Sequence, residues 1–222
     1  MKLNELVKTH KLSVQSFPAF KQLETLSNQN GQVLELATIA PNFMLEQGKG
    51  VYYSPVIPRD SKFTSAQDII DADLDVQQIV VMHYPVVDEN RDDIIIASRH
   101  QGTVDILLKQ YPNATVLATV TPDVIKGMHV VGTLPPSLCS FAKSYTAVTI
   151  KDFDYNKDGD LKGQELLDRI QISAPVNVSV TDSQKELSKK ELINKVLELF
   201  DNQTSVYCSE QSDFINKIKG MM

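Results

Sequence analysis

The chain has 222 residues, of which 42% are hydrophobic and 23% are charged, and its formal net charge is −6 at pH 7. This length allows one large domain or two small domains with a substantial hydrophobic core. An acidic chain with a pI near 5.2 lacks the basic surface that binding of long nucleic acid requires, although a few local positive groups can still hold a small nucleotide. The two cysteines have neither metal-ligand nor redox spacing, and no apolar run approaches membrane-spanning length. We therefore expect a cytoplasmic protein without disulfides, membrane contact or a cofactor.

The first 77 residues predict an α/β extension whose role the sequence does not indicate. Apolar residues at 20, 23 and 26 predict a helix that ends at Asn30-Gly31, and the runs at 33–39 and 51–53 predict strands. Residues 64–67, Thr-Ser-Ala-Gln, have the form of a capping box and predict a helix through Leu74.

Residues 78–172 predict a Rossmann-like α/β domain with a mainly parallel sheet and helices on both faces. Its strands are expected near 79–82, 94–98, 115–120, 128–132 and 145–150. Residues 173–222 predict an edge strand at 176–180 followed by a mostly helical segment. In that segment Leu192, Val196, Leu199 and Phe200 lie along one side of a predicted helix and Ile193 and Leu197 along another, which is more apolar surface than one packing face requires.

The first candidate site residues are those of the segment Ser98-Arg99-His100-Gln101-Gly102. The segment follows the apolar run at 94–97 and precedes apolar residues at the spacing of an amphipathic helix. A strand-to-helix junction places side chains and backbone N–H groups at the carboxyl edge of a sheet, where open α/β folds bind ligands. Arginine and histidine at such a place can bind and protonate a phosphate, although a solvated basic loop would have the same sequence.

A second junction follows the predicted strand at 128–132. Gly132 and Thr133 come directly after this strand, and Pro135 and Pro136 predict the start of a helix. We expect Gly132 to let the backbone approach a ligand closely and Thr133 to offer a hydroxyl and an N–H. The two prolines lack backbone N–H groups, so this helix start offers two fewer hydrogen-bond donors to a phosphate than usual.

Together these motifs resemble a family of small type III CRISPR accessory proteins. The resemblance rests on Ser-Arg-His-x-Gly at 98–102, Gly-Thr-Leu-Pro at 132–135, the strand at 145–150 and Lys-Gly-Gln-Glu-Leu at 162–166, and it covers roughly residues 93–172. Members are regarded as ring nucleases, which degrade the cyclic oligoadenylate messenger that the CRISPR complex makes on detecting foreign RNA. This chain has Lys162 where the family usually has arginine, and Met128 where it usually has aspartate.

The resemblance implies cleavage of a cyclic oligoadenylate, with cyclic tetra-adenylate as the expected ring, by attack of a ribose 2′-hydroxyl on the neighbouring phosphodiester. Such an attack needs no metal if the enzyme aligns the hydroxyl and stabilises the extra phosphate charge. Arg99 is expected to neutralise that charge and His100 to act as general acid or base. The expected ligand-binding residues are Ser98, Gly102, Gly132, Thr133 and Lys162. A symmetric ring is best matched by a two-fold homodimer.

Two alternatives remain open from the sequence. A protein that binds the cyclic nucleotide without cleaving it, as a sponge or sensor, would carry the same phosphate-binding residues. Residues 154–165 also match the twelve-residue EF-hand calcium loop, with oxygen donors at Asp154, Asn156, Asp158, Asp160 and Glu165. An EF-hand needs an entering helix, whereas the run at 145–150 is β-branched and predicts a strand. A calcium-binding interaction module is therefore the second alternative.

The other histidines are expected to be structural or solvated. His10 lies in a polar segment, and His129 lies within the strand that precedes Gly132. His83 ends an apolar strand, where a position at the ligand edge is the alternative, but its apolar neighbours favour burial. The four histidines have no metal-ligand spacing, so no zinc site is expected. Cys139 is expected to be a core thiol.

Overall fold

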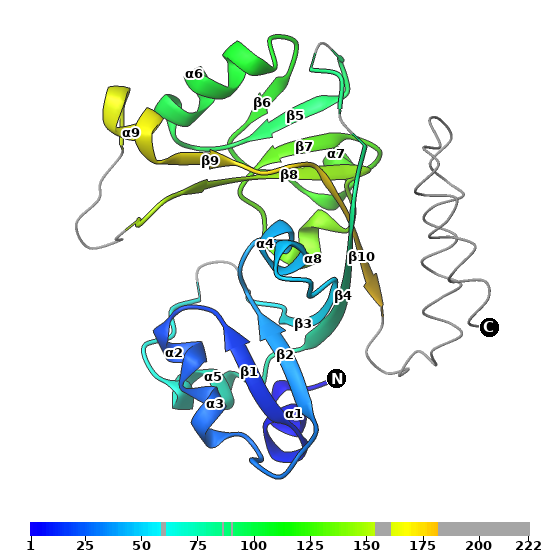
Figure 1. Ribbon diagram of the computed structural model, residues 1–222, viewed down its shortest axis with the longest axis vertical. Coiled ribbons are helices and arrows are strands. Elements are labelled where there is room, and N and C mark those ends of the chain that lie inside the picture. Colours follow the sequence, from blue (N-terminus) through cyan, green and yellow to red (C-terminus); the bar gives the residue numbers. More distant parts are fainter. Residues whose placement is uncertain (59–60, 86, 90, 154–160, 182–222) are drawn as a thin grey trace, which may run out of the picture. The chain divides into compact units, whose positions relative to one another are not determined.

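A computed structural model describes residues 1–58, 61–85, 87–89, 91–153 and 161–181 of the chain (Figure 1). Its strands are β1 (Lys11–Gln15), β2 (Val33–Ala37), β3 (Val51–Pro55), β4 (Val76–His83), β5 (Ile94–Ala97), β6 (Thr115–Leu117), β7 (His129–Gly132), β8 (Ser144–Ile150), β9 (Ile170–Ile172) and β10 (Val176–Thr181). Its helices are α1 (Leu3–Thr9), α2 (Pro18–Lys21), α3 (Leu23–Leu26), α4 (Pro41–Glu46), α5 (Ala66–Ala72), α6 (Gln101–Gln110), α7 (Pro122–Ile125), α8 (Pro136–Cys139) and α9 (Gly163–Arg169).

The described strands form one mixed sheet in the order β1-β2-β3-β4-β10-β8-β7-β5-β6, with β9 paired to β8. β1, β2 and β3 are mutually parallel, as are β8, β7, β5 and β6. Between these two groups, β4 and β10 are antiparallel to each other and to their outer neighbours. The α/β class and the mostly parallel sheet are thus confirmed, with antiparallel pairs around β4 and β10 and between β8 and β9.

The expectation of an edge strand at 176–180 is wrong. β10 lies in the interior of the sheet, where Val176 to Thr181 pair with His83 to Gln78 of β4, and Val176 also pairs with Tyr145 of β8. Its alternating polar residues resemble a half-exposed strand, but the partners on both sides come from segments far away in the sequence. Val176 and Val178 are buried in the core that they share with β4 and β8.

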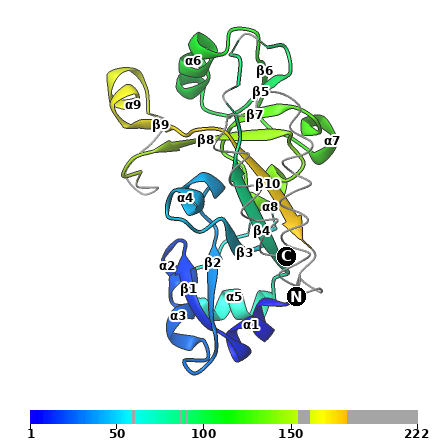
Figure 2. The same cartoon turned by 45° about the vertical axis from the view of Figure 1, so that its right-hand side comes forward.

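The parallel group β6-β5-β7-β8 has helices on both faces, as the sequence predicts (Figure 2). Alternate residues of each strand point to opposite faces. Ile94 and Ile96 of β5 pack with Leu107 of α6 on one face. Ile95 and Ala97 belong to the core on the other face, which contains α7 and α8. Burial on both faces explains why β5 is a continuous apolar run.

The N-terminal group packs α1, α2, α3 and α5 against β1, β2 and β3. Phe20 of α2 and Ile69 of α5 are fully buried in this core. The capping box of α5 is shifted by one residue from its expected position. Ser65 is the N-cap and accepts a hydrogen bond from Asp68 N, and the Asp68 carboxylate accepts one from Ser65 N. Aspartate at the third helical position thus fills the role expected of Gln67.

The contacts between Cα atoms group the described residues into one compact unit. The expected division into segments 1–77, 78–172 and 173–222 stays a prediction. The apolar positions from Leu192 to Phe200, and Cys208, lie outside the described residues. No helix in the described ranges has the length and hydrophobicity that crossing a membrane requires.

Candidate functional site at the carboxyl ends of β5 and β7

Both predicted junctions lie at the same edge of the sheet. Ala97, the last residue of β5, pairs with Gly132, the last residue of β7, and Gly132 pairs with Ala147 of β8. Ser98 and Thr133 therefore leave neighbouring parallel strands at the same level. The structure thus brings together two segments that are more than thirty positions apart in the sequence.

The chain order places this edge at a topological switch point. The chain passes from β5 to β6 on one side and then returns to β7 on the other side of β5. α6 follows β5 onto one face of the sheet, while α8 follows β7 onto the opposite face. In open α/β sheets, ligands bind outside the carboxyl ends of the two strands from which the chain departs in opposite directions.

The junction between β5 and α6 presents the Ser98–Gly102 motif at the start of a ten-residue helix. His100 is the N-cap, and its backbone carbonyl accepts from Val104 N at 3.1 Å. Ser98 Oγ accepts from His100 N at 3.2 Å, which tightens the turn and leaves the hydroxyl hydrogen able to donate. The side chains of Arg99 and His100 are exposed, and within the described part of the chain Arg99 makes no ion pair.

Position 132 requires a glycine because of its backbone conformation and its close neighbours. Its φ of +149° lies in a region that side chains rarely adopt, and a Cβ here would stand 2.2 Å from Ala97 O. The structure therefore shows the backbone of β5 as a close neighbour of this glycine. Thr133 is exposed, and its Oγ1 donates to Val148 O of β8 at 2.9 Å. In this arrangement the hydroxyl has acceptor capacity for a ligand, while its hydrogen is already used.

Gly102 brings a third segment to the same edge. A Cβ on Gly102 would lie 3.0 Å from Leu161 O, 3.0 Å from Leu166 Cδ2 and 3.7 Å from Lys162 Cγ. The absence of a side chain thus lets the first turn of α6 pack against the start of α9. Lys162 is the exposed N-cap of α9. All seven residues predicted to form the site, Ser98, Arg99, His100, Gly102, Gly132, Thr133 and Lys162, lie on these three neighbouring segments.

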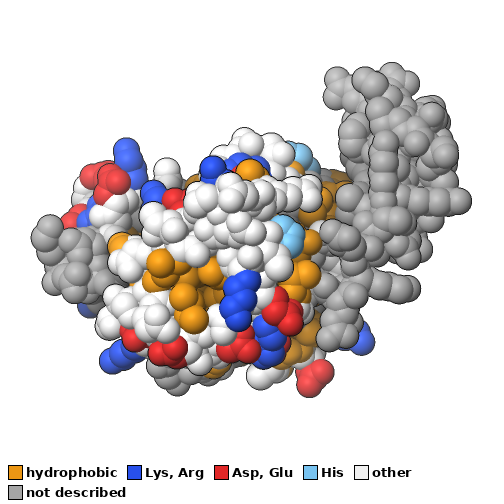
Figure 3. Space-filling model, turned by 90° about the horizontal axis from the view of Figure 1, so that it is seen from below, with side chains coloured by type: hydrophobic (Ala, Val, Ile, Leu, Met, Phe, Trp, Pro, Cys, Tyr) orange, Lys and Arg blue, Asp and Glu red, His pale blue; other side chains and the backbone are white. Residues whose placement is uncertain are grey.

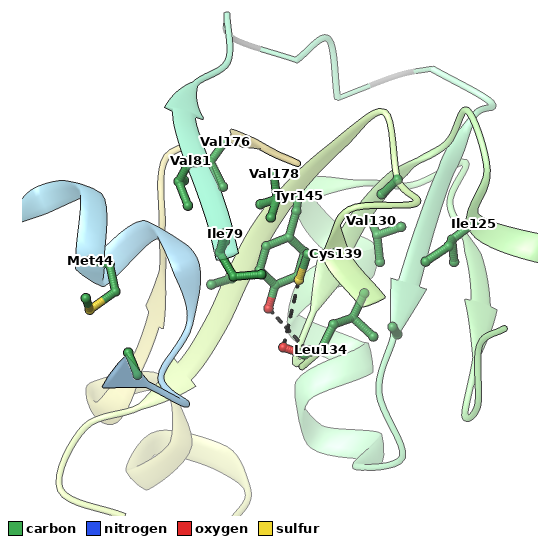
Figure 4. Packing of buried hydrophobic residues seen from close by; sticks show 14 of the residues in the cluster. Met44, Ile79, Val81, Ile125, Val130, Leu134, Cys139, Tyr145, Val176 and Val178 are labelled. Atoms are coloured by element: carbon green, nitrogen blue, oxygen red, sulfur yellow. Dashed lines mark hydrogen bonds between the residues drawn. The ribbon is translucent and has the colours of Figure 1, made fainter. Parts of the chain in front are cut away.

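Tyr145 is a residue of this site that sequence reasoning missed. Its ring is 1% exposed, and its hydroxyl donates to Gly132 O at 2.8 Å and accepts from Leu134 N at 3.2 Å. Figure 4 shows this hydroxyl beside Leu134 and Cys139 within the core. An aromatic residue at the start of a buried strand predicts packing only. The sequence does not show that its hydroxyl reaches the turn after the preceding strand.

His129 is structural, as expected. It is 1% exposed, with Nδ1 2.7 Å from Ser144 Oγ and Nε2 3.3 Å from Thr146 Oγ1. Burial, followed by the charge of Arg91, lowers the pKa of His129 from 6.5 to about 4, so the ring is neutral at pH 7. Cys139 is buried as predicted. The expectation for His83 is wrong, because this residue is exposed at the end of β4, beside Val176.

The calcium alternative receives no structural test. Asp154, Asn156, Asp158 and Asp160 lie outside the described residues, and Glu165 forms an ion pair with Arg169 one turn later in α9, at 3.3 Å. Among the residues whose placement is described, no group of three or more His, Cys, Asp or Glu could hold a metal ion.

On the face drawn in Figure 3, basic and acidic side chains lie beside one another and do not gather into one basic surface. Comparisons of the chain with models of protein families, with curated protein sequences and with solved structures find no match. Function must therefore be inferred from the residues at the sheet edge and from the motifs that they form.

Proposed function

We propose that this protein is a ring nuclease that cleaves a cyclic oligoadenylate messenger without a metal and so modulates type III CRISPR signalling. The proposal includes a Rossmann-like arrangement of residues 78–172 around the nucleotide. One observation carries it: the Ser98–Gly102 and Gly132–Thr133 motifs, which resemble those of the ring nuclease family, leave adjacent strands at a topological switch point.

The residues at this edge supply the groups that phosphodiester cleavage needs. The ribose 2′-hydroxyl attacks the adjacent phosphorus, the bond to the 5′-oxygen breaks, and a 2′,3′-cyclic phosphate and a 5′-hydroxyl result. Arg99 neutralises the charge that builds up on the phosphate oxygens. His100 either accepts the proton of the 2′-hydroxyl or donates one to the departing 5′-oxygen. Ser98 can donate a hydrogen bond to a phosphate oxygen.

Two features make this edge suitable for an anion. The first N–H groups of α6 have no partner within their own helix, and they lie at the positive end of its dipole. Arg99, His100 and Lys162 add three basic side chains to an otherwise acidic protein. Local charge of this kind suits a small cyclic nucleotide better than a long nucleic acid.

The decisive experiment is incubation of the full chain with cyclic tetra-adenylate, followed by chromatography of the products. We expect a linear product that ends in a 2′,3′-cyclic phosphate. His100→Ala should lower the rate by about 10²–10⁴-fold with little change in affinity, because the proton transfer matters only in the transition state. Arg99→Ala should weaken both binding and turnover, because the phosphate interacts with the positive charge of Arg99 in the ground state and in the transition state.

His83→Ala is the matched control. Like His100, His83 is an exposed histidine at the end of a strand, but it ends β4 and pairs with Val176 of β10, away from the β5 and β7 junctions. Its rate should equal that of the wild type. Tight binding without any linear product would favour a sponge that sequesters the messenger. Absence of both binding and cleavage would refute the proposal.

A further inference from the structure

The turn between β7 and α8 is held from inside the core by one phenolic hydroxyl. Tyr145, the second residue of β8, donates to Gly132 O at 2.8 Å and accepts from Leu134 N at 3.2 Å. Burial raises the pKa of this phenol well above 10, so it keeps the proton that it donates. One side chain therefore satisfies two buried backbone groups.

The two hydrogen bonds fix the backbone on both sides of Thr133. The peptide group before Thr133 directs its carbonyl toward Tyr145, and the peptide group after Thr133 directs its N–H there. Because a peptide unit is planar and moves as one body, a hydrogen bond to one of its polar atoms restricts the orientation of the whole unit. The bond from Thr133 Oγ1 to Val148 O, at 2.9 Å, adds a third point of attachment to β8.

The residue that is held in this way is exposed at the candidate site. Thr133 leaves β7 beside Ser98, and its side chain is accessible to solvent. A fixed backbone at this place lowers the ordering cost of ligand binding, since the turn is already in one conformation. A loose turn would first have to be ordered by the ligand.

We propose that Tyr145 is a positioning residue of the switch-point site, which sets the conformation of the Gly132–Leu134 turn for binding of a phosphate-containing ring. This inference rests on the proposed function. Tyr145 lies behind the turn and acts only through the backbone of Thr133 and its two neighbours.

The chain offers a matched control in Tyr52 of β3. Tyr52 is also 1% exposed and belongs to the same core cluster as Tyr145. Its hydroxyl is buried but has no hydrogen-bond partner among the described residues. Tyr145→Phe and Tyr52→Phe thus each remove one buried hydroxyl and keep the ring, but only the first leaves Gly132 O and Leu134 N without their partner.

The test measures binding, kinetics and amide exchange for the wild type and both variants. Tyr145→Phe should raise the KM for cyclic tetra-adenylate by about tenfold and change kcat by less than about twofold, because binding is lost equally in the ground state and the transition state. Hydrogen exchange at the Leu134 amide should become faster in Tyr145→Phe. Tyr52→Phe should match the wild type in KM, in kcat and in exchange at the Leu134 amide.

The KM separates positioning from simple destabilisation. Partial unfolding lowers the amount of active enzyme and hence kcat, while KM stays constant. An unchanged KM in Tyr145→Phe would overturn the inference, whether or not kcat falls. If the wild-type protein binds the ring without cleaving it, the Kd for the ring replaces KM in this comparison. An unchanged Kd in Tyr145→Phe would then overturn the inference. A wild type that does neither refutes the proposed function itself.

Discussion

Gly132 illustrates how a single residue depends on a neighbour from another strand. Its sequence context suggests close approach to a ligand, but the space above its Cα is occupied by Ala97 O of β5. Gly127 makes a useful comparison, because its φ is also positive, at +77°, while nothing lies within 4 Å of the position that a Cβ would take. Comparing a substitution at Gly127 with the same substitution at Gly132 therefore separates the cost of backbone strain from the cost of steric overlap.

We expect Gly132→Ala to destabilise the fold far more than Gly127→Ala. Gly127→Ala should cost about 1–2 kcal/mol, which is the strain of a side chain at positive φ. Gly132→Ala adds an overlap that only a shift of β5 against β7 can relieve, so its cost should be about 3 kcal/mol or more. Urea unfolding of both variants measures the difference, and equal losses would contradict this explanation.

At the scale of elements, β7 and β8 are joined by a buried histidine. His129 of β7 contacts Ser144 and Thr146 of β8 through its two ring nitrogens. Its pKa is lowered to about 4, whereas in the unfolded chain the ordinary value of 6.5 applies. Between these two values the unfolded state binds the proton and the folded state does not.

Stability should therefore fall as the pH is lowered from 6.5 to 4. Because the unfolded state gains a proton in this window, the free energy of unfolding decreases, by an amount on the order of 3 kcal/mol. Above pH 6.5 His129 is neutral in both states and contributes no pH dependence. Urea midpoints measured across this range test the effect. His129→Asn keeps a polar group near Ser144 but cannot titrate, so a slope as steep as that of the wild type would rule out His129 as the cause.

Most elements were predictable because their signals are local. The apolar runs that became β4, β5, β7 and β8 and the helical stripe that became α6 depend on residues within one segment. The exact N-cap of α5 was missed by one residue, since both Thr64 and Ser65 are good caps, and it is Ser65 Oγ that accepts the hydrogen bond from Asp68 N. The interior position of β10 was missed because its partner β4 lies about 100 residues earlier in the chain.

The candidate site was predictable in its parts but not in its assembly. The sequence identifies Ser98–Gly102 and Gly132–Thr133 as strand-to-helix junctions, but it contains no information on register. The pairing of Ala97 with Gly132 and the contact of Gly102 with Leu161 bring these segments together. Tyr145 was not found, because a hydroxyl that bonds to backbone atoms of another strand leaves no local pattern.

For the molecule as a whole, the proposed chemistry predicts that a chelator has no effect. In the proposed mechanism, attack by the 2′-hydroxyl uses Arg99 and His100 in place of a metal, so excess EDTA should leave the cleavage rate within about twofold of its value without EDTA. Chromatography of the products with and without EDTA is the measurement. Activity that disappears in EDTA and returns with calcium or magnesium would refute the metal-free mechanism.

A calcium titration followed by thermal unfolding provides the complementary control. A ligand that binds only the native state must raise the apparent stability. A rise in melting temperature that is absent in Asp154→Ala would support the EF-hand-like loop at 154–165 as a calcium site, whatever the result with EDTA.

The symmetry of the proposed ligand leads to a prediction about assembly. A cyclic tetra-adenylate ring has two-fold symmetry, and two copies of Arg99 and His100 related by a two-fold axis would meet equivalent phosphates on opposite sides of it. The apolar positions of the C-terminal sequence, such as Leu192 and Phe200, exceed what one packing face requires and are candidates for the interface. Light scattering should therefore give about twice the chain mass of 24.8 kDa without ligand. A protein that stays monomeric when saturated with the ring would show that one chain forms the complete site, and it would contradict both the shared site and the interface.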